Sequence, residues 1–69
     1  MTKQDFINMG GKLWEKNGME RVYISASIFN KLFETSFGDN TNKFFFDCSE
    51  NAVMRSHKGK KPQIEKRYE

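Results

Sequence analysis

The first stretch of apolar positions in this chain follows helical spacing. Thr2 followed by Asp5 resembles a capping box at its start. Asn17-Gly18 is a suitable helix stop, because glycine tolerates the left-handed conformation that follows a helix. The pattern therefore predicts a first helix over residues 3–16. Its apolar stripe is Phe6, Met9 or Gly10, Leu13 and Trp14.

Two adjacent glycines, Gly10 and Gly11, lie inside this predicted helix. Each glycine costs about 1 kcal/mol relative to alanine in a helix interior. Because Gly10 falls on the apolar stripe, we expect the pair to allow close packing against a strand.

Further along, alternating and helical patterns follow each other. Val22 and Ile24 alternate with Arg21 and Tyr23, which predicts a strand with two different faces. The apolar residues of the next segment again share one helical face, and Ser25 or Ser27 can cap it. The predicted elements are a strand over 19–24, a helix over 26–35, a loop over 38–42, a strand over 43–48 and a returning strand over 52–56.

This order predicts a small α+β domain. Two short helices would pack on one face of a small, mostly antiparallel three-stranded sheet. Residues 1–57 form the compact domain, and residues 58–69 form a basic C-terminal segment. Pro62 interrupts regular structure, and residues 63–69 are either a last strand or a loose tail.

Charge is distributed unevenly along the chain. Residues 1–54 hold six Lys and Arg against seven Asp and Glu, whereas residues 55–69 hold six against two. Such a basic region beside a nearly neutral body predicts a surface that meets an anionic partner. The expected binding residues in this region are Arg55, His57, Lys58, Lys60, Lys61, Lys66, Arg67 and Tyr68.

The basic segment has two interpretations. Lysines around Gly59 suit phosphate contacts, with an affinity that falls as salt rises. Tyr68 beside Arg67 suits stacking on a base. The alternative is a solvated terminus whose lysines serve solubility.

A second aromatic and basic group lies near the N-terminus. Trp14 and Tyr23, with Lys12, Lys16 and Arg21, fit a nucleic-acid surface. The favoured alternative is that Trp14 anchors the first helix to the sheet, with Arg21 half-buried on its strand.

Three consecutive phenylalanines occupy the 43–48 strand. Alternation places Phe44 and Phe46 on one face with Cys48, and we expect both rings in the core. Phe45 falls on the other face with Lys43 and Asp47. We therefore expect Phe45 to be an exposed interface residue.

The sequence contains no catalytic signature. One histidine, His57, and one cysteine, Cys48, are too few for a zinc site. Cys48 at the end of an apolar strand is more often an inert core residue. We predict no enzymatic activity, no metal and no cofactor.

Size and targeting signals limit the choices further. The chain has 69 residues, and its single cysteine excludes an internal disulfide. No signal peptide and no apolar run of membrane-spanning length is visible. We expect a cytoplasmic protein without membrane contact, as part of a dimer or as a monomer.

Residues 10–24 resemble the opening of a group of short proteins found on bacteriophages and other mobile elements. The shared segment has the form GGxxWxKxxMxRVY, here running from Gly10 to Tyr23. An aromatic strand closing in Asp, as in Phe44 to Asp47, occurs later in similar chains. The resemblance implies a phage origin. Small phage proteins of this kind include anti-CRISPR inhibitors, which act by binding.

The first functional hypothesis is therefore a non-enzymatic inhibitor that binds a bacterial CRISPR-Cas or other defence complex. The basic segment and an exposed aromatic residue would carry the contact, against nucleic acid or an acidic protein patch. The alternative is a small DNA- or RNA-binding regulatory protein that uses the same segment on phosphates.

Overall fold

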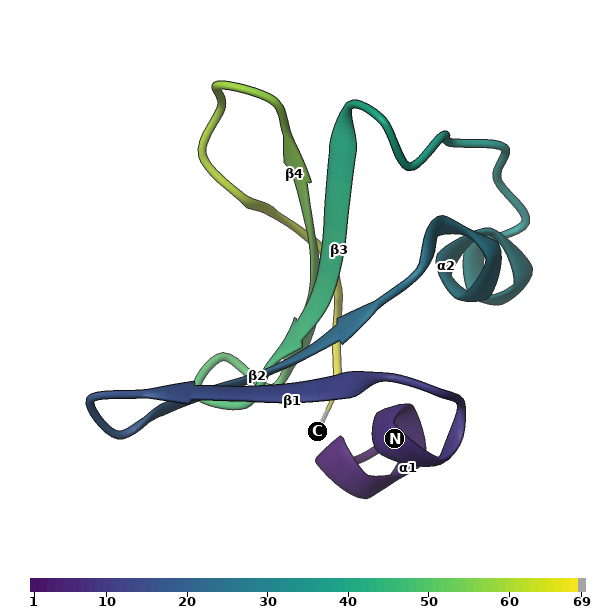
Figure 1. Ribbon diagram of the computed structural model, residues 1–69. Helices are drawn as coiled ribbons and strands as arrows, with labels where there is room; N and C mark the ends of the chain where they lie inside the picture. Colours follow the sequence, from purple (N-terminus) through teal and green to yellow (C-terminus); the bar gives the residue numbers. More distant parts are fainter. Residues whose placement is uncertain (69) are drawn as a thin grey trace.

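The computed structural model describes residues 1–68 and shows one sheet with two short helices (Figure 1). Both helices pack on the same side of the sheet. In chain order the elements are α1 (Lys3–Asn8), β1 (Lys12–Lys16), β2 (Met19–Ile24), α2 (Ala26–Phe33), β3 (Asn42–Asp47), β4 (Ala52–His57) and β5 (Gln63–Arg67).

The sheet has five antiparallel strands in the order β1-β2-β3-β4-β5. The α+β class agrees with the sequence prediction, but the prediction of three strands was wrong. The two extra strands lie at the edges. β1 was hidden in the predicted first helix, and β5 in the basic segment.

The first helix ends at Asn8, not at residue 16. The capping box of Thr2 and Asp5 is present, but Asn17 and Gly18 do not end a helix. They have φ values of 53° and 81° and join Lys16 to Met19 across a two-residue hairpin. Two positive φ angles in such a loop are the requirement of a type I′ turn, which Asn-Gly satisfies well.

The two glycines after α1 have separate roles. Gly10 has a φ of +105°, which an L side chain rarely adopts. At Gly11, an added Cβ would lie 2.5 Å from Cγ1 of Val22 and 2.7 Å from the carbonyl oxygen of Phe6. The expected close approach to a strand is therefore present, and it occurs at Gly11. It allows the chain to turn from α1 directly into β1.

The main core lies between the helices and one face of the sheet. Phe6 of α1 stacks on Phe46 with ring centroids 4.7 Å apart. Phe29 of α2 packs on Phe44 at 4.4 Å. Val22 and Val53 complete the centre and are fully buried. The prediction that Phe44 and Phe46 are core residues is confirmed.

Residues 63–67 form β5, one of the two alternatives for the C-terminal part. The strand pairs with β4 and has an irregular register opposite Val53 and Met54. Its end is held by the Asn51 backbone and side chain, which bond to the backbone of Tyr68. Part of the basic segment is thus built into the sheet.

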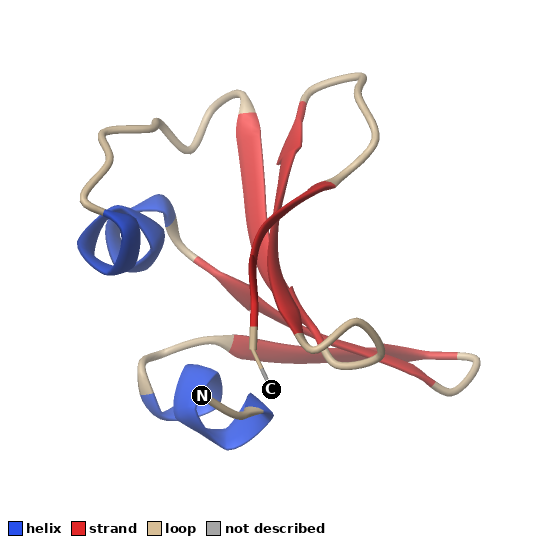
Figure 2. Ribbon diagram, turned by 180° about the vertical axis from the view of Figure 1, so that it is seen from behind, coloured by secondary structure: helices blue, strands red, loops and turns tan. Residues whose placement is uncertain are grey.

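The sheet is strongly bent, and its two sides differ in what covers them. The helices lie on one side, whereas the β1–β2 hairpin and the β4–β5 connection extend on the other (Figures 1 and 2). The second face of the sheet lies between these two extensions, and neither helix covers it.

Candidate functional site

We call the sheet face opposite the helices the open face. Strand register assigns its residues, because side chains alternate between the two faces and cross-strand partners share a face. They are Lys12, Trp14, Lys16, Met19, Arg21, Tyr23, Lys43, Phe45, Asp47, Ala52, Met54, Ser56, Ile64 and Arg67.

Charge separates the two faces of the sheet. The open face carries five basic strand residues and one acid, Asp47. The helix-covered face carries two basic strand residues, Arg55 and Lys66, and three acids, Glu15, Glu20 and Glu65. The strand pairing therefore concentrates positive charge on the side that no helix covers.

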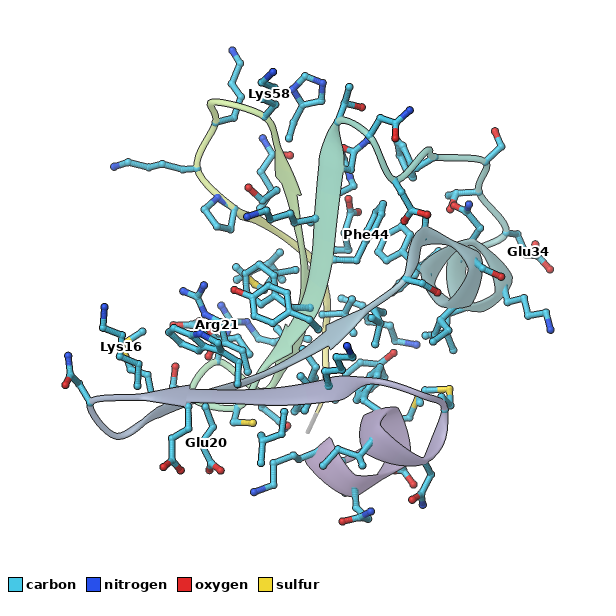
Figure 3. The ribbon with its side chains drawn as sticks, viewed as in Figure 1. Lys16, Glu20, Arg21, Glu34, Phe44 and Lys58 are labelled. Carbon is cyan, nitrogen blue, oxygen red and sulfur yellow. The ribbon has the colours of Figure 1, made fainter. Side chains whose placement is uncertain are left out.

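Arg21 lies at the centre of the open face, between two aromatic rings (Figure 3). Its guanidinium is 4.6 Å from the ring centroid of Phe45 and 5.5 Å from that of Trp14. One of its terminal nitrogens donates a hydrogen bond to the Tyr23 hydroxyl at 3.2 Å. Such cation–π contacts fix both the cation and the rings.

Asp47 balances Arg21 incompletely. Asp47 Oδ2 lies 3.9 Å from Nε of Arg21, at the limit of an ion pair. Its other oxygen accepts hydrogen bonds from the backbone N–H and hydroxyl of Ser49 in the β3–β4 turn. Within residues 1–68 the buried Nε of Arg21 has no hydrogen-bond partner. The alternative of a half-buried Arg21 on its strand is confirmed.

Phe45 is not an exposed aromatic residue, which corrects the sequence expectation. It is on the predicted face but only 2% exposed. It forms a small second core with Ala52 and Met54, and the Tyr23 ring covers it at a centroid distance of 5.3 Å. Phe45 is therefore the floor of the open face and is shielded by Arg21 and Tyr23.

Trp14 does not anchor a helix to the sheet, because it belongs to the edge strand β1. Its ring meets Tyr23 edge-on at 6.3 Å with an interplanar angle of 88°. It is partly exposed, and Lys12 and Lys16 flank it on the same strand face. The aromatic and basic group recognised in the sequence is thus assembled on the open face.

Among the expected binding residues, Lys61 and Arg67 border the open face. A hollow of about 620 Å³ runs from Arg21 and Phe45 to Lys61 in the β4–β5 connection. Arg67 pairs with Glu50, with Nη1 3.0 Å from Oε2. These two basic residues stand on the opposite side of the open face from Lys12 and Lys16.

Arg55 and Lys66 lie on the helix-covered face. Arg55 forms an ion pair with Glu65 and sits 4.5 Å from the Phe37 ring centroid. Lys66 lies 5.2 Å from the ring of Tyr68. These contacts give both residues structural partners on the side away from the open face.

The Tyr68 ring also belongs to the helix side. It packs edge-on against Phe6 at 6.1 Å and lies 6.4 Å from Phe46. Burial raises the pKa of its hydroxyl above the ordinary value. The structure thus places Tyr68 against the main core and not beside Arg67 on the open face.

His57, Lys58 and Lys60 are exposed where β4 ends and the chain turns. The backbone N–H of Lys58 donates to the Thr41 carbonyl at 2.8 Å, which ties this turn to the loop before β3. Lys58 lies at the tip of the connection, away from Arg21 (Figure 3). These three residues form a basic rim separate from the centre of the open face.

The described residues bring no catalytic or metal-ligating set together. Across residues 1–68, no three His, Cys, Asp or Glu side chains are placed to hold a metal ion. Burial raises the pKa of the Cys48 thiol, which lowers its fraction of reactive thiolate. Neither α1 nor α2 has the length and apolar character to cross a membrane.

Two residues that line a hollow at the edge of the open face, Lys43 and Asp39, were missed from sequence. Lys43 was recognised as a strand residue but not as a binding residue. Asp39 appeared only as part of a turn. The available signal was alternation, which already grouped Lys43 with Phe45 and could have been extended across β1 once Asn17-Gly18 was recognised as a hairpin turn.

No family model, curated protein or solved structure matches this chain. The resemblance of residues 10–24 to short phage proteins therefore stays a prediction.

Proposed function

We propose that this protein binds single-stranded nucleic acid on its open face and performs no reaction. One observation supports this most strongly: a partly exposed Trp14 and Tyr23 are fixed around Arg21 on a face with five basic strand residues. Stacking on aromatic side chains within a basic groove is the common mode of single-strand recognition.

A single strand fits this surface better than a duplex. In a duplex the flat faces of the bases are stacked inside, and sequence is read from the grooves by an inserted helix or ribbon. Both helices here pack against the sheet on the other side. The open face presents aromatic rings, which reach bases that are already unstacked.

Lysines on both borders would contact the phosphates. Lys12 and Lys16 lie on the edge strand β1. Lys43 on β3 and Lys61 in the β4–β5 connection extend the basic surface across the sheet. Each phosphate contact releases counterions, so affinity should fall steeply with salt.

The test uses the fluorescence of Trp14, the chain's single tryptophan. Titration with a single-stranded oligonucleotide should change its emission, and affinity should fall as salt rises. The double variant Lys12→Gln, Lys16→Gln should weaken binding and reduce the log–log salt slope by about 1 to 2.

Lys31→Gln is the matched control, because Lys31 is an exposed lysine on α2. It should leave the affinity nearly unchanged. Equal losses in the control and the double variant, or no binding of any single strand at low salt, would overturn the proposal.

A second candidate is inhibition of a bacterial defence complex, in which the same face contacts a nuclease or its bound guide. It is favoured by one observation: Trp14, Arg21 and Tyr23 of the phage-like segment all meet on the open face. Expression in a CRISPR-bearing host tests it through plasmid interference. Interference that stays unimpaired at high expression would exclude this role.

A further inference from the structure

We propose that the open face contains a pocket for one nucleobase, selective for a base with an amino group and best suited to guanine. This inference rests on the proposed function and names the part of the strand that is read. The pocket is a hollow of about 410 Å³ at the end of β2, where Trp14, Tyr23 and Lys43 of the open face meet Asp39. Ile24, Asn42 and Phe44 of the helix-covered face also line it.

The hollow exists because β3 extends two residues past the end of β2. The last pair between these strands joins Ile24 to Phe44, and the chain then turns into α2 at Ala26. β3 starts two residues earlier, at Asn42, where it pairs with β4 alone. The edge of β3 at Lys43 that would face β2 is therefore left without a strand partner.

Aromatic rings provide the stacking side of the pocket. The Arg21 guanidinium covers the Trp14 ring on one side, and Tyr23 meets that ring edge-on. Trp14 is therefore held in place before a ligand arrives. A ring that is already ordered loses little side-chain entropy when a base stacks on it.

Asp39 provides the hydrogen-bonding side. Its Oδ1 accepts the backbone N–H of Ala26 at 2.9 Å, which fixes the carboxylate at the start of α2. Among residues 1–68 no donor is bonded to Oδ2. An exposed carboxylate repels phosphate, so the part of a nucleotide facing Asp39 must be the base, with N–H groups directed at the carboxylate.

Lys43 completes the arrangement by drawing the phosphate away from Asp39. It lies on the open face one strand from Tyr23 and lines the same hollow. The opposite charges of Asp39 and Lys43 thus orient a nucleotide, with its base toward the carboxylate and its phosphate toward the ammonium group.

Base chemistry then sets the preference. Guanine presents two adjacent N–H donors. Because each carboxylate oxygen has two lone pairs, these donors match Oδ2 and the lone pair of Oδ1 that the Ala26 N–H leaves free. Cytosine and adenine present one amino group, and carboxylates accept from the cytosine amino group in known recognition patterns. Thymine presents a single N–H between two carbonyl oxygens, both of which repel a carboxylate. The expected order is guanine, then cytosine and adenine, then thymine.

The experiment compares oligothymidine with the same oligonucleotide carrying one central guanosine. Trp14 fluorescence reports binding of both. The guanosine should raise the affinity of the wild-type protein by about tenfold, the usual size of one good bidentate contact. Equal affinities for the two oligonucleotides would overturn the pocket.

Asp39→Asn tests the mechanism while keeping an oxygen for the Ala26 N–H. This variant should bring the guanosine preference close to one and leave oligothymidine bound at least as tightly as before. Glu34→Gln makes the same charge change at the far end of α2, away from Arg21 (Figure 3), and should keep the preference.

The outcomes separate this inference from the proposed function. If no single strand binds, both fail. If the strands bind with the expected salt dependence but Asp39→Asn keeps the guanosine preference, the base pocket is wrong and the open-face function stands. Unchanged melting temperatures of Asp39→Asn and Glu34→Gln confirm that both variants are folded when these comparisons are made.

Discussion

The two faces of the sheet bury equivalent side chains in different ways. Phe44, Phe45 and Phe46 are consecutive and each is 2% exposed. Phe44 and Phe46 are covered by aromatic rings of α2 and α1, whereas Phe45 is covered by Arg21 and Tyr23. The three rings are therefore equally buried but differently covered. On the helix side the covering side chains are apolar and come from helices. On the open face they are polar and cationic, and a ligand can reach them.

This difference indicates that the helix-covered face stabilises the fold and that the open face is available for binding. Burial of apolar surface between helices and sheet provides most of the stability that a domain of this size can reach. On the open face the partly satisfied Arg21 and the partly exposed Trp14 contribute less to stability and are available for binding.

The largest effect is expected from truncating the aromatic core on the helix side. Phe46→Ala removes a fully enclosed ring and should lower the free energy of unfolding by about 3–5 kcal/mol. Phe45→Ala should cost about 2–3 kcal/mol, because Arg21 and Tyr23 can settle into part of the vacated space.

Chemical denaturation followed by circular dichroism measures both changes. Since small domains have little stability in reserve, Phe46→Leu and Phe45→Leu provide a second pair that keeps most of the ring volume filled. Equal losses at the two positions in both pairs would contradict the difference between the covers.

The next effect concerns the tight turn from α1 into β1. Gly11→Ala places a methyl group within 2.7 Å of a backbone oxygen, which must shift α1 against β2. We expect a loss of about 1–3 kcal/mol, measured by thermal unfolding. Gly38→Ala is the control, because nothing lies within 4 Å of its added Cβ. A loss at Gly38 equal to that at Gly11 would exclude the steric explanation.

Local pattern predicted much of the interior of this fold. The bounds of the 19–24 strand, the faces of Phe44 and Phe46 and the Thr2–Asp5 capping box followed from alternation and capping chemistry. These features depend on neighbouring residues, so a single sequence contains them.

The edge strand β1 could not be predicted in the same way, whereas a strand at residues 63–69 was one of two alternatives. Leu13 and Trp14 satisfy a helical stripe with Phe6 as well as a strand alternation, and tertiary pairing with β2 decides between the two. Because β1 was missed, Trp14 was assigned to the core and not to the open face. The Asp39 position depends on contact with Ala26, far along the chain, which no local pattern reveals.

The smallest predicted effect is a pH response on the helix side. Burial raises the pKa of Tyr68 above its ordinary value of 10.0, so the folded state holds this proton more tightly than the unfolded state. Its stabilising contribution is complete below pH 10 and is lost as the pH rises through the folded-state pKa.

Tyr68→Phe keeps the ring packing and removes the titrating hydroxyl. Its melting temperature should therefore fall less steeply above pH 10 than that of the wild type. Identical alkaline slopes for the two proteins would contradict burial of Tyr68 in the helix-side core.

The central claim is that the open face, not the basic rim or the helices, binds single-stranded nucleic acid. Chemical-shift mapping by NMR with a single-stranded oligonucleotide tests it most directly. The predicted result is a continuous set of shifts over Trp14, including its indole N–H, Arg21, Tyr23 and Lys43, with residues 30–33 at the far end of α2 unchanged. Shifts confined to His57, Lys58 and Lys60, or to residues 30–33 of α2, would contradict the account.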